Sequence, residues 1–151
     1  MLSKKFMNTI NLNVKFLLNL ARVQSIMSKR FDRGMGNGVG FSEFLILFYL
    51  NQSDSQKMRR IDLAEKIGMT ASGVTRMLLP MEKIGLIKSG SIDEDARVRS
   101  VLLSEGGKQK LDEALERFEI LGEDIFSSVK IKEIEAASNL LVEIGGKILM
   151  S

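Results

Sequence analysis

The chain has 151 residues, a formal net charge of +3, and no cysteine, histidine or tryptophan. The missing cysteine excludes disulfides, thiolate metal sites and a cysteine nucleophile, and the missing histidine excludes imidazole bases and the commonest metal ligand. The length suits one ordinary domain. No apolar run approaches the roughly 20 residues of a membrane span, and asparagines and Lys15 interrupt the first apolar stretch, where a signal sequence needs its core. We expect an unprocessed cytoplasmic protein with no membrane partner.

Charge is distributed unevenly along the chain. Residues 1–33 contain seven Lys/Arg against one acidic residue, a net +6, whereas residues 105–151 contain six against ten, a net −4. The basic beginning and the acidic end can pair with each other, within one subunit or across a dimer. They can equally be solvated faces that happen to differ in sign.

Apolar residues at helical spacing predict a first long helix from Ile10 to Phe31. They form two stripes, so more than one partner has to cover this helix. The glycine cluster RGMGNGVG ends it, and residues 34–40 are expected to form a flexible link. Ser42 is the expected N-cap of a short apolar helix that reaches about Leu50, and the following NQSDSQK is expected to be a polar loop.

Two further helices follow, each with a glycine at its end. RIDLAEKI is amphipathic over two turns and stops at Gly68. Thr70 caps the next helix, in which apolar residues recur every three or four positions to Ile84, and Gly85 closes it. Pro80, the only proline, falls inside this helix on the side away from its apolar face. We therefore expect the helix to bend there and to continue to about Ile84.

The rest of the chain predicts a hairpin and two helices. GLIKSG and RVRSVLL are β-prone, and the acidic turn IDEDA separates them. Ser104 with Glu105 then starts a helix that has one apolar face. The last helix has a seam of apolar residues spaced three and four apart, suited to packing on another helix: Ile134, Ala137, Leu141, Ile144 and Ile148. The expected fold is mainly α, with a small β-hairpin.

Two helices joined by a short glycine-containing turn and followed at once by a hairpin make a winged helix-turn-helix. In this plan the start of the second helix enters the DNA major groove, where its backbone N–H groups bind phosphate and its side chains reach base edges. The hairpin, called the wing, reaches the adjacent minor groove or the backbone. The order of elements therefore indicates a DNA-binding protein.

The stretch LAEKIGMTASGVTRMLLPMEKIGLIKSGSIDEDARVRSVLLSEGG resembles the multiple-antibiotic-resistance regulator (MarR) family of transcription factors. It covers about a third of the chain. The resemblance rests on LAEKIG in the first helix, VTRMLLPMEKIGLI in the second, and a wing pattern of D-x-R, five residues, and Leu-Ser-x-x-Gly. The wing positions are Asp95, Arg97, Leu103, Ser104 and Gly107. A helix-turn-helix match alone is weak, whereas the joint spacing of these features is specific.

The resemblance implies a single MarR-like domain that forms a homodimer. Helices in residues 1–33 and 105–151 would hold the dimer, and the winged helix-turn-helix in residues 41–104 would bind half of a pseudo-palindromic operator. Half-sites of a symmetric dimer lie roughly 10 base pairs apart. Family members often act as repressors that small, commonly anionic aromatic ligands release from DNA. The implied partners are double-stranded DNA, a second copy of the chain and such an effector, with no cofactor and no metal.

Carried onto this sequence, the family's major-groove contacts fall at the start of the recognition helix: Thr70, Ala71, Ser72, Thr75 and Arg76. The wing arginine is Arg97, which in the family enters the minor groove while Asp95, two residues before it, holds its guanidinium. Alternation along a strand puts these two side chains on one side. Ala96 departs from the family pattern, since a second arginine is common there, and Arg99 is close enough in sequence to compensate.

The residues leave alternatives open. Asp95 and Arg97 can be a surface ion pair only, and Arg76 can cap a carbonyl. The acidic turn can be a metal site or a group of solvated carboxylates. The chain can also be a winged-helix module for protein interaction alone, which would show no salt-dependent binding to duplex DNA. An enzyme is not expected, because no motif suggests a paired carboxylate or lysine site.

Overall fold

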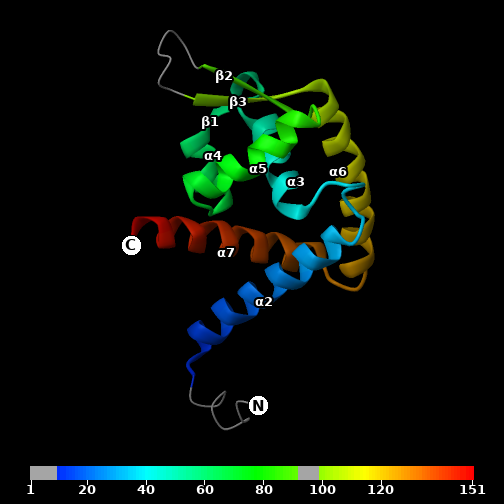
Figure 1. The fold of residues 1–151 in the computed structure, drawn as a ribbon. Coiled ribbons are helices and arrows are strands. Elements are labelled where there is room, and N and C mark those ends of the chain that lie inside the picture. The colour runs from blue at the N-terminus through cyan, green and yellow to red at the C-terminus, as the bar shows by residue number, and fades with distance from the viewer. Residues whose placement is uncertain (1–9, 92–98) are drawn as a thin grey trace, which may run out of the picture. The chain divides into compact units, whose positions relative to one another are not determined.

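The computed structural model describes residues 10–91 and 99–151, and Figure 1 shows its helices and strands. They are α2 (Leu12–Asp32), α3 (Phe41–Gln52), the 3-10 helix η1 (Asp54–Gln56), β1 (Lys57–Arg59), α4 (Arg60–Ile67), α5 (Ala71–Lys83), β2 (Ile87–Ser91), β3 (Arg99–Leu103), α6 (Glu105–Ile125) and α7 (Ile131–Met150). The chain divides into two compact units, Met1–Leu115 and Glu116–Ser151, and α6 runs from the first into the second. The prediction of a mainly helical fold with a small β-hairpin is confirmed.

The strands form one antiparallel sheet in the order β1-β3-β2, with β3 in the middle. β2 and β3 are the predicted hairpin strands, and Ser89 lies opposite Val101. The third strand, β1, contradicts the prediction of a polar loop over NQSDSQK, because that stretch contains η1 and the first residue of β1. Met58 of β1 pairs with Val101 from the other side of β3. A three-residue strand has no alternation to detect, and its partner lies far along the chain.

α3 begins earlier than predicted, and another residue supplies its capping acceptor. Gly40 is the N-cap residue, and Ser42 lies in the first turn with its side chain exposed. The N–H of Phe41 donates to Asp32 Oδ1 over 2.8 Å. The prediction of Ser42 as N-cap is therefore wrong, because a carboxylate at the end of α2 satisfies the first turn of α3.

An aromatic cluster joins the end of α2 to α3. Phe31 is fully buried, and its ring centroid lies 5.4 Å from that of Phe41 and 4.9 Å from that of Phe44. The fully buried residues of the helices and the sheet complete the core of this unit: Ile46, Leu47, Leu50, Leu63, Val74, Ile87, Val101 and Leu111. The core thus lies between α3, α4, α5, the sheet and the first half of α6.

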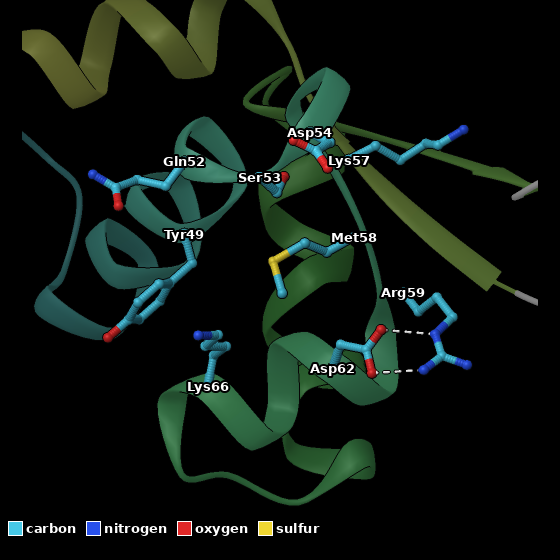
Figure 2. Close-up of a pocket in the computed structure, with 9 residues that line it drawn as sticks. All are labelled: Tyr49, Gln52, Ser53, Asp54, Lys57, Met58, Arg59, Asp62 and Lys66. Atoms are coloured by element: carbon cyan, nitrogen blue, oxygen red, sulfur yellow. Dashed lines mark hydrogen bonds and ion pairs between the residues drawn. The ribbon is translucent and has the colours of Figure 1, made fainter. Parts of the chain in front are cut away.

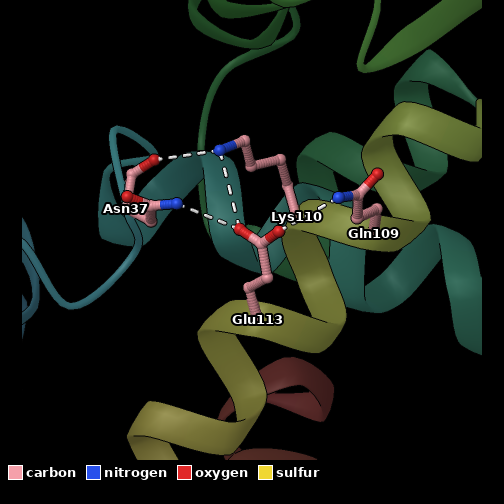
Figure 3. Close-up of polar contacts among 4 residues, drawn as sticks. All are labelled: Asn37, Gln109, Lys110 and Glu113. Carbon is pink, nitrogen blue, oxygen red and sulfur yellow. Dashed lines mark hydrogen bonds and ion pairs between the residues drawn. The ribbon is translucent and has the colours of Figure 1, made fainter.

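The glycine-rich segment between α2 and α3 is packed, which corrects the prediction of a flexible link. Met35 and Val39 are buried within it. Its Asn37, whose φ of +52° is in the left-handed region, donates from Nδ2 to Glu113 Oε2 over 3.0 Å, and Lys110 Nζ donates to the Asn37 carbonyl over 3.3 Å (Figure 3). Hydrogen bonds from Asn37 and Gln109 lower the pKa of Glu113, with Asn37 as the largest cause. The segment is therefore attached to α6 at its middle.

The predicted helix ends around the helix-turn-helix are confirmed. Gly68 and Gly85 both have φ in the left-handed region, +67° and +83°, which glycine adopts without steric cost. Thr70 caps α5, and its Oγ1 accepts a bond from the Gly73 N–H over 3.0 Å. Ser104 does the same at the start of α6, where its Oγ accepts from the N–H of the third helical residue over 3.0 Å. These signals are local, so the sequence alone could locate them.

In the unit Glu116–Ser151, the apolar residues of α7 are largely exposed. Of the predicted seam, Ile134 and Ile144 are half-buried, whereas Leu141 and Ile148 are exposed. The packing of this seam on another helix stays a prediction. Within residues 10–91 and 99–151, no helix is long and apolar enough to cross a lipid bilayer.

Candidate nucleic-acid interface

α4 and α5 are the two helices of the predicted helix-turn-helix, and residues 68–70 join them. α5 buries one side through Val74, Leu78 and Met81. That packing fixes the helix to the core and leaves its other side exposed. The middle and the end of α5 are therefore packed against the core, whereas its first turn is exposed on the surface.

Pro80 lies on the exposed side of α5, as predicted, and the helix runs through it to Lys83. The helix thus continues almost to the predicted end, while the bend at Pro80 stays a prediction. Ile84 was predicted on the apolar face, but it is 67% exposed. It is the C-cap residue of the helix, followed by Gly85 in the left-handed conformation.

The structure brings together the five predicted contact residues at the start of α5. Ala71, Ser72 and Arg76 are exposed, Thr75 is half-buried, and the hydroxyl oxygens of Thr70 and Ser72 lie 3.3 Å apart. The first turn contains no acidic residue. The first backbone N–H groups of a helix carry partial positive charge, and no carboxylate of this turn neutralises it. This end of the helix is chemically suited to an anion such as a phosphate.

The wing is described only up to its outer turn. Lys88 lies opposite Leu102 in the hairpin, and Arg99, exposed at the start of β3, lies opposite Ser91. Asp95 and Arg97 lie outside the described residues, and so does the acidic turn that was considered as a metal site. In the described part of the chain, no three His, Cys, Asp or Glu residues are grouped to hold a metal ion.

Sequence reasoning missed a paired arginine beside the wing. Arg59 is the last residue of β1, opposite Ser100 of β3, and its guanidinium binds both carboxylate oxygens of Asp62 over 2.7 and 2.8 Å. These hydrogen bonds are the largest cause of a lowered pKa at Asp62 and a raised pKa at Arg59. The i, i+3 spacing of the two residues was visible, but the strand that puts Arg59 next to β3 was not predicted.

A pocket of about 660 Å³ opens between the end of α3, β1 and α4. Figure 2 shows the thioether of Met58 pointing into it and the ammonium of Lys66 near the ring of Tyr49. The Lys66 Nζ lies 5.9 Å from the centre of that ring, a cation–π distance. The Arg59–Asp62 pair lies at the edge of the same pocket. Its lining thus combines one ring and one thioether with cationic side chains and the carboxylates of Asp54 and Asp62.

The part of the chain from α3 to the wing matches a known family. Residues 41–98 match the family model described as the MarR family. This segment, which contains the helix-turn-helix and most of the wing, is therefore similar to the MarR family. The match confirms the resemblance seen in the sequence, and it contains the five predicted contact residues of α5 as well as Asp95 and Arg97. Arg99 lies one residue beyond it.

Known transcriptional regulators are similar to this chain over most of its length. The uncharacterized HTH-type transcriptional regulator YdgJ of Bacillus subtilis is 23% identical over 134 residues, which are 89% of this chain and 79% of YdgJ. Sco3205, a MarR family transcriptional regulator from Streptomyces coelicolor solved in complex with DNA, is 16% identical with a TM-score of 0.74, covering 90% of this chain and 88% of Sco3205. The organohalide-sensing regulator RdhR-CbdbA1625, bound to 2,4-dichlorophenol, is 20% identical with a TM-score of 0.77, covering 93% and 83%. The likeness in fold therefore extends well beyond the matched segment.

Proposed function

We propose that this chain is a sequence-specific, DNA-binding transcriptional regulator of the MarR family. The start of α5 carries the proposal: it is exposed, capped by Thr70, free of carboxylates in its first turn, and followed by Arg76 one turn later. Its N–H groups suit a phosphate, while hydroxyl and guanidinium groups suit base edges in the major groove. The proposed contacts are Thr70, Ala71, Ser72, Thr75 and Arg76. The DNA complex of Sco3205 supports this function, since that relative has the same fold.

Arg76→Ala tests the helix contact. A duplex is first selected from a random pool with the wild-type protein, and affinity is then measured over a range of salt concentrations. Loss of a base contact is expected to cost about 1–3 kcal/mol, and loss of a phosphate contact to reduce the salt slope by about 1. Arg22→Ala, which removes the same charge from an exposed position on α2, is the control. Wild-type protein without salt-dependent duplex binding would favour the alternative, a winged-helix module for protein interaction alone.

The wing is the second proposed contact. Arg97, oriented by Asp95, would reach the minor groove, and Arg99 would support it from the start of β3. Arg97→Ala is expected to weaken operator binding strongly while thermal stability and subunit association stay nearly unchanged. Unchanged operator affinity would remove the wing from the proposed interface.

We further propose that the regulator is a homodimeric repressor that binds a pseudo-palindromic operator in the cytoplasm. Leu12 and Leu18 on α2 are 79% and 51% exposed, and Val142 on α7 is 77% exposed. Apolar faces of this kind are usually covered by a partner, and two copies of one chain would cover each other's faces symmetrically. Light scattering of the purified chain should then give twice its mass of 16.9 kDa. A monomer at micromolar concentration would contradict this part of the proposal.

A small effector completes the proposal, because the similar regulator RdhR-CbdbA1625 binds 2,4-dichlorophenol. The pocket beside Tyr49, Met58 and Lys66 is the proposed place, since a ring and a thioether can pack on an aromatic ligand and an ammonium can pair with its negative charge. Titration with 2,4-dichlorophenol, followed by the release of bound duplex, tests it. Lys66→Met should weaken both effects, and equal release from both proteins would place the effector elsewhere.

Pro80 has a proposed part in how α5 enters the groove. It lacks the N–H that would bond to the Arg76 carbonyl, and its ring crowds that carbonyl. The resulting bend would separate the half of α5 that contacts DNA from the half that is buried. Pro80→Ala should raise thermal stability and change operator affinity, and a crystal structure with a straight wild-type helix would refute the bend.

A further inference from the structure

The end of α5 is bonded directly to the first strand of the wing. Both carboxylate oxygens of Glu82 accept hydrogen bonds from Ser89: Oε1 from the backbone N–H over 3.0 Å and Oε2 from the hydroxyl over 2.9 Å. These bonds lower the pKa of Glu82, the backbone bond most. A carboxylate that binds one residue with both oxygens fixes that residue in direction as well as distance.

An arginine from α4 reaches the same serine. Arg60, the first residue of α4, donates from its Nη2 to the Ser89 hydroxyl over 3.2 Å. Its positive charge is also felt by the Glu82 carboxylate. Its Nε is buried and has no hydrogen-bond partner, so this guanidinium is partly withdrawn from water. Three elements, α4, α5 and β2, therefore meet at one serine side chain.

The turn between α5 and β2 is held on both sides. On its inner side, Leu86 and Ile87 are 5% and 1% exposed, so they anchor the chain to the core. On its outer side, the Glu82–Ser89 bonds close a span of seven residues across the left-handed Gly85. The direction in which β2 leaves α5 therefore depends on the buried pair and on the Glu82 carboxylate together.

We propose that Glu82 is a positioning residue for DNA binding, which sets the angle between the recognition helix and the wing by holding Ser89 against Arg60. The inference rests on the proposed function, because the angle matters only if α5 and the wing bind one duplex together. Glu82 itself need not touch DNA. With the contact removed, the wing would sample a wider range of directions, so its phosphate contacts would be lost or would form only at an entropic cost.

Whether neutralising Glu82 weakens or strengthens DNA binding distinguishes a positioning role from simple charge repulsion. A carboxylate close to DNA repels phosphate, so neutralising Glu82 should strengthen binding if charge alone mattered. A positioning role predicts the opposite sign, because phosphate contacts made by the wing are lost. A contact that only stabilises the fold would lower the melting temperature and leave the affinity of the folded protein unchanged.

Glu82→Gln is the test variant, and Glu65→Gln is the matched control, since Glu65 is an exposed carboxylate on α4 of the same winged helix. The probe is the duplex selected from a random pool by the wild-type protein, measured at several salt concentrations well below the melting temperature. We expect Glu82→Gln to bind about tenfold or more weakly, with a salt slope lower by about 1–2, as for one or two lost phosphate contacts. Glu65→Gln should bind as tightly as the wild type or more tightly. Equal or tighter binding by Glu82→Gln would overturn the proposal.

Substitutions of Ser89, the other partner in the contact with Glu82, should reduce DNA affinity to different degrees. Ser89→Ala removes the hydroxyl but keeps the backbone N–H bonded to Glu82, so its loss of affinity should be smaller than that of Glu82→Gln. Ser89→Thr keeps a hydroxyl and should restore most of the wild-type affinity. A loss in Ser89→Thr as large as that in Glu82→Gln would contradict a role for these hydrogen bonds.

Amide hydrogen exchange without DNA measures the positioning independently of the proposed function. The Ser89 amide should exchange about tenfold faster in Glu82→Gln than in the wild type, while amides in the middle of α5 stay unchanged. Unchanged exchange at Ser89 would show that Glu82 does not hold the strand, and would overturn the inference. If the wild type itself selects no duplex and shows no salt-dependent binding, the proposed function fails and the inference fails with it, whatever the exchange data show.

Discussion

The winged helix buries its apolar residues within its own core, whereas the long helices α2 and α7 leave most of theirs exposed. From α3 to the first half of α6, large apolar side chains such as Leu47, Leu63 and Leu111 are fully buried within one unit. In α2 only Phe31 is buried, and in α7 no residue is, although both helices are described along their whole length. The winged helix therefore has a core of its own, whereas α2 and α7 have apolar faces that their own unit leaves open.

The buried residues of the winged helix stabilise the fold, whereas the exposed apolar faces of α2 and α7 are available to a partner. The segment that matches the MarR family model, residues 41–98, lies in the winged helix, which has its own core. The exposed faces of α2 and α7 support the proposed homodimer, since their burial in an interface would stabilise association by about 25 cal/mol for each Å² of apolar surface. Substitutions on the two sides should thus change different quantities: the free energy of unfolding on one side and subunit association on the other.

The largest effect is expected at Phe31, where α2 enters the core. Phe31→Ala removes a fully buried ring that contacts two other aromatic rings, so the free energy of unfolding should fall by about 3–5 kcal/mol. Urea denaturation followed by circular dichroism measures it. Leu18→Ala, at a 51% exposed position of the same helix, is the control and should cost less than about 1 kcal/mol in the monomer. Equal losses in both variants would mean that α2 has a second buried face.

The next effect concerns Gly107, where α6 meets the start of β2. A Cβ added there would lie 2.0 Å from the Leu86 carbonyl oxygen and 2.8 Å from Leu103 Cδ1. Gly107→Ala should therefore force α6 away from the sheet and cost about 1–3 kcal/mol or more. Gly122→Ala, in the same helix with open space around it, should be neutral or stabilising. Comparison of the two melting curves measures the effect, and a stable Gly107→Ala protein would contradict the close packing.

On the other side of the comparison, Val142 tests the exposed face of α7. Val142→Asp puts a charge on a 77% exposed position, so the monomer should keep its free energy of unfolding within about 0.5 kcal/mol. If α7 contributes to a dimer, burying that charge should weaken association by about 2 kcal/mol or more, roughly thirtyfold in the dissociation constant. Sedimentation equilibrium measures it. An unchanged dissociation constant would exclude this part of α7 from the interface.

What could be predicted from the sequence follows from how local each signal is. Gly68, Gly85, Thr70 and Ser104 mark helix ends through contacts within a few residues, and the structure confirms all four. Ser42 failed as a cap because the acceptor came from the preceding helix, at Asp32. Signals of this second kind depend on packing, which a one-dimensional pattern does not contain.

The candidate site divides in the same way. The start of α5 was predictable because cap, polar contacts and apolar face repeat along one helix. The third strand, β1, and the contact of Arg60 with Ser89 were not, since β1 pairs with the distant β3 and Arg60 lies 29 residues before Ser89. The part of the site that would contact DNA was thus visible in the sequence, whereas the part that holds the wing in place was not.

The smallest effect is expected where the two regions join, at Asn37. Hydrogen bonds, first from Asn37, keep the pKa of Glu113 below its ordinary value of 4.5 in the folded protein. A carboxyl whose pKa is lower in the folded than in the unfolded chain stabilises the fold above the ordinary value, and this stabilisation is lost as the pH falls through the folded pKa. Asn37→Ala removes the largest cause, so the unfolding free energy should fall less steeply on acidification than in the wild type. Urea denaturation at about pH 7 and about pH 3 measures the difference, with Asn13→Ala on the exposed face of α2 as the control. Equal acid dependence in all three proteins would show that the Asn37 side chain does not bind Glu113 in solution.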